Sequence, residues 1–302
     1  MVNGRESIWA LADRRLTYPN QQPRDNARKL MFLDTKDGVA ILGYAGLGAT
    51  VRGTEPADWI GAVLRGRNLP LEQCLGALAD ALRRQLPKHL RTLPAGAPAG
   101  HNIIVSAFVD EQVRLYTIDL VLAPDRRHFA FHYTRHVVHS PPGLPQRTPR
   151  LGLAGSGAAF LVRDKAWIRN LLRLVRASDA KKVSPSRIAD ELASINQVAA
   201  ANTRDGSVGP SCIVAWRHRK SGVHKGGGAH QFYEGTRRTS DSSALPTIAN
   251  GMDIQALIKA MQPHIFRQME ALRTGAPSPE LNVTELNAEL AKIPERPDET
   301  LK

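Results

Sequence analysis

The order of the apolar segments constrains the fold of this 302-residue chain more than any other feature of the sequence. Runs of strands alternate with pairs of helices, which favours an α+β fold because a βαβ fold alternates strands with single helices. The order fits a four-layer αββα sandwich, in which two antiparallel sheets lie face to face between helix pairs. Strands are expected at 7–17, 28–34, 38–45, 102–108, 113–120, 128–138 and 212–216, and helices at 57–64, 71–86, 155–175 and 185–201.

Leucine spacing supports the second of these helices. Leucines recur every three or four residues, at 71, 75, 78, 82 and 86, which gives one apolar face on a helix. Pro87 follows the last of them. This segment is therefore expected to cover one face of a sheet.

The composition changes after residue 216, which predicts two parts. Residues 1–216 carry the alternating strands and helices. Residues 217–302 begin with a basic, glycine-rich loop, contain one helix at 253–272 and end in a proline- and glutamate-bearing stretch. Such a composition is typical of an appendage with a partly mobile tail.

Several short motifs occur in the order known from one enzyme family. Ala12-Asp13-Arg14-Arg15 ends a strand, Lys29 opens the next strand, and Ala45-Gly46-Leu47-Gly48 follows a third. Gly155-Ser156-Gly157 precedes a helix, and Arg204-Asp205-Gly206-Ser207 follows another. Over about residues 7–216 this pattern resembles the proteasome-type N-terminal-nucleophile (Ntn) hydrolases, which have the αββα fold.

The resemblance implies roles for five residues. Lys29 would lower the pKa of the terminal nucleophile, Asp13 and Asp205 would hold Lys29, and Ser156 and Ser207 would lie beside the site. Ser207 comes one residue early, because Val208 occupies the position of the family's serine. Gly48 or its neighbours would line the oxyanion turn. Family members cleave peptide or amide bonds as threonine- or serine-type peptidases, form homo-oligomers and need no cofactor or metal.

Each residue also has an ordinary structural interpretation. Asp13 and Arg15 can cap a turn and pair at the surface, where such pairs contribute little. Lys29 can be an exposed residue at the start of a strand. Gly155-Ser156-Gly157 can be a helix entry that uses glycine for its backbone freedom.

The nucleophile of such an enzyme is missing from the sequence. Met1 precedes Asp13 by only twelve residues, removal of Met1 exposes Val2, and Ser7 lies inside a strand. The first strand with its Thr, Ser or Cys would then lie upstream, or the protein is an inactive scaffold of the same fold. As written, the chain is expected to be inactive.

Charge suggests a third class of function. The net charge of +13 predicts nonspecific binding of polyanions such as nucleic acids at low salt. Only two cysteines, the absence of a 20-residue apolar run and the lack of a signal-peptide pattern favour a cytoplasmic protein and no membrane contact.

Two other patterns are weaker. Gly43-Tyr44-Ala45-Gly46-Leu47-Gly48 follows a strand, but its spacing and the late start of the next helix disfavour a dinucleotide loop. His128, His132, His136 and His139 alternate with aromatic residues, which indicates a strand. Residues four apart on a strand lie about 13 Å apart, too far to share one metal.

Overall fold

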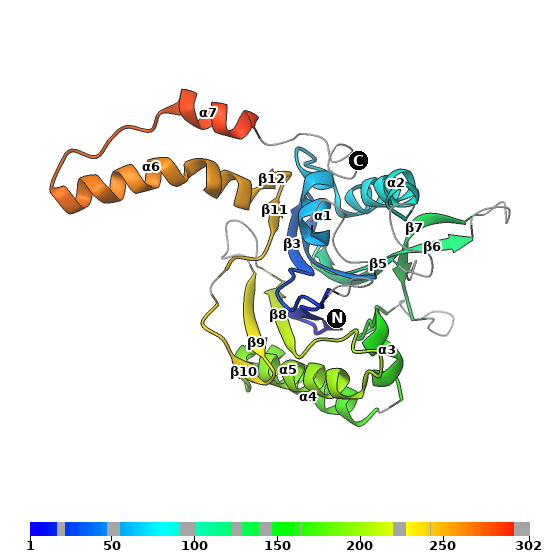
Figure 1. Cartoon of the computed structure of the whole chain (residues 1–302). Coiled ribbons are helices and arrows are strands. Elements are labelled where there is room, and N and C mark those ends of the chain that lie inside the picture. The colour runs from blue at the N-terminus through cyan, green and yellow to red at the C-terminus, as the bar shows by residue number, and fades with distance from the viewer. Residues whose placement is uncertain are drawn as a thin grey trace.

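A computed structural model describes residues 1–16, 22–46, 55–90, 101–122, 129–138, 147–163, 165–219, 228–241 and 243–292 (Figure 1). The strands are β1 (Val2–Asn3), β2 (Ser7–Asp13), β3 (Leu30–Thr35), β4 (Gly38–Gly46), β5 (His101–Val109), β6 (Gln112–Leu122), β7 (Phe129–His136), β8 (Ser211–His218), β9 (Ala229–Glu234), β10 (Arg237–Arg238), β11 (Thr247–Ala249) and β12 (Met252–Asp253). The helices are α1 (Pro56–Leu64), α2 (Leu71–Leu90), α3 (Ser156–Leu161), α4 (Ala166–Asp179), α5 (Pro185–Asn202), α6 (Ile254–Thr274) and α7 (Val283–Ala291).

The strands form two sheets. One has the order β1-β2-β8-β9-β10, and the other has the order β12-β11-β3-β4-β5-β6-β7. A mixed α+β architecture with two sheets is therefore confirmed. The expectation that both sheets are antiparallel is wrong in one place, because β11 pairs with β3 in parallel. This pairing was missed because β11 is only three residues long and lies far from β3 in the sequence.

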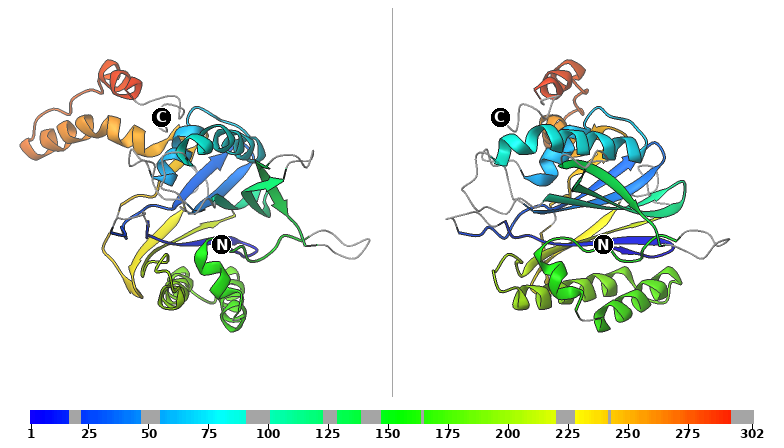
Figure 2. Two further views of the ribbon diagram at one scale, coloured as in Figure 1. Left: turned by 45° about the vertical axis from the view of Figure 1, so that its right-hand side comes forward. Right: turned by 90° about the vertical axis from the view of Figure 1, so that its right-hand side faces the viewer.

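Three hydrophobic clusters fill the space between these elements. The first joins α1 and α2 to the seven-stranded sheet, and includes the buried residues Leu71, Leu75, Leu78 and Leu82 of the leucine stripe. The second joins α4 and α5 to the five-stranded sheet, and the third lies between the two sheets. Figure 2 shows the same arrangement, with the two sheets between α1 and α2 on one side and α4 and α5 on the other.

One predicted helix is two helices in the structure. The segment expected to run from Gly155 to Val175 is divided into α3 and α4. The indole nitrogen of Trp167 donates a hydrogen bond of 2.9 Å to the carbonyl of Leu161 at the end of α3. This bond satisfies a carbonyl that the ending helix leaves without a partner, and apolar periodicity does not reveal such a break.

The strands β9 to β12, which follow residue 228, belong to the two sheets. β9 pairs with β8, and β11 pairs with β3, so this region adds strands to both sheets. The boundary expected at residue 217 falls inside β8 (Ser211–His218). The part that extends away from the sheets consists of α6 and α7 (Figure 1).

The close approach of β5 to the start of β4 requires glycine at position 38. A Cβ atom on Gly38 would lie 1.9 Å from the carbonyl oxygen of Phe108, which is backbone and cannot move aside. We expect Gly38→Ala to lower the free energy of unfolding by more than about 2 kcal/mol, measured by urea denaturation. The matched control is Gly61→Ala in α1, where the new Cβ meets only the Ile248 side chain at 3.9 Å. For Gly61→Ala we expect no loss of unfolding free energy, since alanine favours the helix over glycine by about 1 kcal/mol. Equal losses in Gly38→Ala and Gly61→Ala would contradict this account.

Candidate functional site

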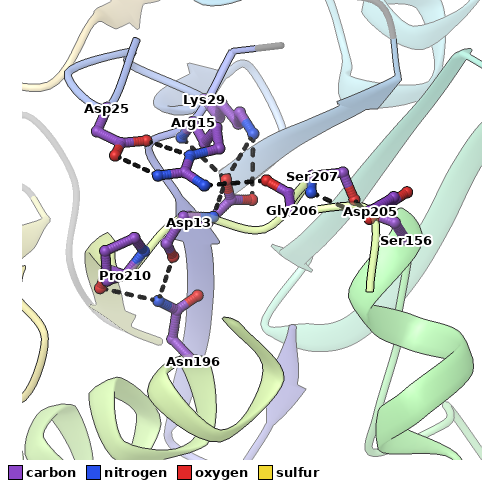
Figure 3. A network of polar contacts seen from close by, with 11 residues as sticks. Asp13, Arg15, Asp25, Lys29, Ser156, Asn196, Asp205, Gly206, Ser207 and Pro210 are labelled. Atoms are coloured by element: carbon purple, nitrogen blue, oxygen red, sulfur yellow. Dashed lines mark hydrogen bonds and ion pairs between the residues drawn. The ribbon is translucent and has the colours of Figure 1, made fainter. Parts of the chain in front are cut away.

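A cavity of about 670 Å³ opens where the ends of the two sheets meet α3 and α5. It is lined by the end of β2, the start of β3, the end of β4, the first turn of α3 and residues 205–208. All five residues singled out in the sequence line this cavity: Asp13, Lys29, Ser156, Asp205 and Ser207. Figure 3 shows them in one network of polar contacts.

Lys29 and Asp13 form the centre of the network. The Lys29 ammonium lies 3.0 Å from Oδ1 and 3.1 Å from Oδ2 of Asp13. Their side chains are only 13% and 19% exposed, respectively. Lys29 directly precedes β3 and Asp13 ends β2, so the pair joins the two sheets. Asp13 Oδ1 also accepts a hydrogen bond of 2.9 Å from the backbone N–H of Arg15, which fixes the carboxylate.

A second polar cluster also lines the cavity. The Ser207 hydroxyl lies 2.6 Å from the Ser156 hydroxyl and 2.7 Å from Asp205 Oδ1. The Asp205 carboxylate also accepts a bond from the Ser207 backbone N–H, and these bonds hold the pKa of Asp205 below its usual value. Because Asp205 is bound to Ser207, it does not pair with Lys29 in this structure. The catalytic roles of the five residues remain predictions.

Arg15 connects the two clusters, and the sequence analysis did not select it. Its guanidinium binds both oxygens of Asp25, at 2.7 and 2.6 Å, and donates a bond of 3.0 Å to the carbonyl of Gly206. It therefore ties the loop that carries Asp205 and Ser207 to the end of β2. The position of Arg15, two residues after Asp13, could have indicated that it belongs to the site. Nothing in the sequence indicated Asp25, since it lies in a polar loop.

Asn196 supports the same loop from α5. Its side-chain amide donates to the carbonyls of Gly209 and Pro210, at 3.0 and 3.1 Å. Asn196 is buried, although most of its buried neighbours in α5 are apolar. A buried amide within an apolar helix face is the signal that could have indicated its positioning role.

We expect Arg15→Ala to make stability less dependent on pH. The Arg15 guanidinium holds the pKa of Asp25 below its usual value of about 3.9. The stability that this pair contributes is therefore fully present above the pKa of Asp25 in the unfolded chain. It is lost as pH falls through the lower pKa of Asp25 in the folded protein. At pH 7 the variant should lose about 1 kcal/mol, and the stabilities of the two proteins should converge as pH falls through the lowered pKa of Asp25. Thermal unfolding across this range tests the expectation, which a loss independent of pH would contradict.

No group of three or more histidine, cysteine or carboxylate side chains is arranged to hold a metal ion among the described residues. His132 and His136 lie on strand β7, in agreement with the strand interpretation, whereas His128, His139 and Gly48 lie outside the described residues. Among the described helices, none combines the length and apolarity that a membrane crossing requires.

Comparisons with known proteins give only distant structural likeness. No protein-family model matches the chain, and no curated protein matches it. Anbu (ancestral beta-subunit) from Yersinia bercovieri is 13% identical, with 91% of this chain and 96% of that chain aligned and a TM-score of 0.40. A helical assembly of the Anbu complex from Pseudomonas aeruginosa is 13% identical, with 90% and 93% aligned and a TM-score of 0.41. Likeness at this level carries no argument about function.

The expected identity of the chain needs correction. A proteasome-type Ntn hydrolase without its first strand was inferred from five short motifs, and no family model supports that assignment. The structure also has a first strand, because β1 pairs with β2 through Val2–Trp9 and Asn3–Ile8. β1 could not be predicted because two residues are too few to show a strand period.

Proposed function

We propose that the cavity beside Lys29 hydrolyses peptide or other amide bonds. The observation that carries the proposal is the Lys29 ammonium, held by both oxygens of Asp13 in the wall of the cavity. An ammonium fixed in a partly enclosed site favours the reactive form of a neighbouring nucleophile and stabilises negative charge on an attacked carbonyl. The Ser156–Ser207–Asp205 cluster supplies further polar groups to the lining of the cavity.

The nucleophile would enter on an extension of β1. In the β1–β2 register, Val2 is opposite Trp9 and Asn3 is opposite Ile8, so three residues added before Met1 bring the first of them opposite Asp13. The Met1 nitrogen donates to the carbonyl of Gly152 at 2.7 Å, and the Gly152 N–H donates to the Met1 carbonyl at 3.0 Å. A peptide N–H can make the first of these bonds as well as an amine can.

Burial at Met1 supports the same geometry. The nitrogen is fully buried, and loss of hydration lowers the pKa of the Met1 amine to about 5. A neutral peptide N–H avoids the cost of burying a charge at this position.

The test is a series of proteins in which β1 is extended by one to five residues that begin with an exposed terminal threonine. We expect release of a fluorophore from peptide amides to peak where the threonine reaches Asp13, at an extension of three or four residues. The one-residue extension, with threonine opposite Leu11, is the matched control and should be inactive. No turnover at any length would refute the proposal.

The order of the helix and sheet layers is also part of this proposal. The three hydrophobic clusters support a four-layer αββα sandwich, and in such a fold the cavity opens at the end of the sheet-to-sheet interface. This location makes the Lys29–Asp13 pair accessible from solvent.

Binding of polyanions is a second candidate function, and α4 favours it. Arg169, Arg173 and Arg176 are exposed at spacings of four and three residues, so they share one face of the helix. Leu171 and Val175 are buried on the opposite face. This charged row suits a phosphate backbone, which is read by charge without sequence preference.

We expect the affinity for single-stranded DNA to fall steeply with salt. Replacement of the three arginines by alanine should reduce the slope of log K against log salt by about two, since each contacted phosphate contributes about 0.7. Fluorescence anisotropy between low and physiological salt measures the slope. Replacing Arg237 and Arg238, which lie on β10, provides the control. An unchanged slope in the α4 variant would rule out this row as the contact surface.

A further inference from the structure

The lining of the cavity beside Lys29 contains one more polar pair, which the proposed hydrolysis does not use. Asn102 of β5 and Asp119 of β6 both line the cavity and lie opposite each other in the strand register. Residues directly opposite each other in an antiparallel pair of strands point to the same face of the sheet. The side-chain amide of Asn102 donates a hydrogen bond to Oδ1 of Asp119, so the two side chains form one polar unit.

The Asn102–Asp119 pair has hydrogen-bond acceptors that no described donor uses. The side-chain carbonyl oxygen of Asn102 is buried and has no hydrogen-bond partner among the described residues. Buried polar atoms without a partner are rare in folded proteins, and each one needs an explanation such as a missing ligand. Asp119 is half-buried, and no ion pair joins its carboxylate to another described residue. The pair therefore presents a negative charge and unused acceptors to the cavity.

The other carboxylates in the described lining of this cavity already have partners or are exposed. Both oxygens of Asp13 are bound by the Lys29 ammonium. Asp205 is exposed and accepts hydrogen bonds from the hydroxyl and the backbone N–H of Ser207. An ion pair is weak where water reaches it and stronger where it is partly buried. Asp119 is therefore the carboxylate of this cavity that is best placed to bind a cation.

The surroundings of the pair suit the side chain of arginine or lysine. A guanidinium or an ammonium has only donors, which match a carboxylate beside an unused amide oxygen. Ile104 lies two residues from Asn102 on the same face of β5 and also lines the cavity. Its apolar surface can pack against the methylene stem of a basic side chain. Because the whole chain has a net charge of +13, binding of a cation here requires such local complementarity.

The order of the strands sets the distance between this pair and the reacting groups. Lys29 directly precedes β3, and its carbonyl accepts a hydrogen bond of 3.0 Å from the N–H of Tyr44 on β4. β4, β5 and β6 follow β3 side by side in the sheet, so Asp119 lies three strand spacings from Lys29, or about 14 Å. An extended peptide covers this distance in about four residues. A peptide that is cleaved beside Lys29 can therefore reach the pair with a nearby side chain.

We propose that the Asn102–Asp119 pair binds a basic side chain of the peptide substrate, within about four residues of the cleaved bond. This inference rests on the proposed hydrolytic function, because it names the substrate class of the same cavity. Asp119 supplies the charge, and Asn102 supplies the second acceptor and positions the carboxylate through its hydrogen bond. Because both residues are fixed in the sheet, the arginine or lysine lies at one set distance from the cleaved bond.

Paired peptides test this preference. The two members of a pair are neutral peptides that differ at one residue, which is arginine in one and citrulline in the other. Citrulline has nearly the shape of arginine but carries no charge. Both are incubated with the β1-extended protein, and mass spectrometry locates the cleaved bonds and measures the rates. We expect the arginine peptide to be cleaved about tenfold faster, at one fixed offset from the arginine, as a charge-assisted hydrogen bond predicts.

Two substitutions show which carboxylate is responsible. Asp119→Asn should bring the ratio of the two cleavage rates close to one. Asp205→Asn is the matched control, because it removes a different carboxylate from the same cavity and should leave the ratio near ten. A ratio that falls in Asp205→Asn but not in Asp119→Asn would overturn the proposal. Equal cleavage of the arginine and citrulline peptides by the extended protein would overturn it too, and would leave the hydrolytic proposal intact.

Binding without turnover separates this inference from the hydrolytic one. Fluorescence anisotropy with labelled forms of the same peptides measures their affinity for the chain without the extension. If no extended protein cleaves any peptide, the hydrolytic proposal fails. About tenfold tighter binding of the arginine peptide, lost in Asp119→Asn and kept in Asp205→Asn, would still support the binding of a cation by this pair. Equal affinity for the arginine and citrulline peptides would overturn the proposal.

Discussion

Replacement of Arg217 by methionine is expected to lower the free energy of unfolding by about 3–5 kcal/mol, because it leaves a buried carboxylate without its partner. Arg217 of β8 forms an ion pair with Asp34 of β3, and their side chains are 1% and 7% exposed, respectively. The guanidinium also donates to the carbonyls of Leu33 and Ala40, at 3.2 and 3.4 Å. The pair links the two sheets through their apolar interface, where an unpaired charge is costly.

A double substitution distinguishes the pair from simple loss of packing. We expect Arg217→Met combined with Asp34→Leu to recover part of the loss, since apolar residues often replace a buried pair without net cost. The control is Arg238→Met, which breaks the exposed pair with Asp190 and should change stability little. Urea denaturation at pH 7 measures the free energy of unfolding of the unmodified protein, Arg217→Met, the double variant and Arg238→Met. A double variant less stable than Arg217→Met would contradict this account of the pair.

Lys29→Ala is expected to reduce hydrolysis by the β1-extended protein by a factor on the order of 10³, within the range of general acid–base groups. Asp13→Asn should cause a similar loss, because it leaves the Lys29 ammonium without the two carboxylate contacts that position it. The reduction should appear in kcat rather than in KM if the ammonium acts on the reacting atoms.

Two controls keep this prediction specific. Lys36→Ala removes an exposed lysine from the turn after β3 and should leave turnover unchanged. Fluorescence from the stacked Trp9 and Trp216 rings, whose centroids lie 5.1 Å apart, reports whether each variant keeps the five-stranded sheet. Unchanged kcat in Lys29→Ala, with the fluorescence preserved, would exclude this lysine from the chemistry.

Periodic segments could be predicted from the sequence because their burial leaves a pattern. Leu71, Leu75, Leu78 and Leu82 of α2 are buried as their spacing indicated, since a helix at a sheet surface has one apolar face to bury. The short strands left no such pattern. β10 and β12 have two residues each and pair through backbone hydrogen bonds alone.

The site could be predicted only in part, because only the residues next to periodic segments could be placed from the sequence. Asp13 and Lys29 follow or precede strands, so strand prediction brought them to one edge of the fold. Arg15 was missed because its contacts with Asp25 and Gly206 depend on loop geometry. Arg217 was assigned to the basic loop that begins at residue 217, since the sequence does not show that Asp34 lies in the facing sheet.

Covalent trapping tests the central claim most directly. The β1-extended protein, with threonine opposite Asp13, is treated with a peptide that bears a C-terminal vinyl sulfone, and the intact mass is measured. The account predicts one added probe per chain, located on the terminal threonine by peptide mapping, and much slower addition in Lys29→Ala. Addition at another residue, or equal rates with and without Lys29, would contradict the assignment of the cavity beside Lys29 as a hydrolytic site.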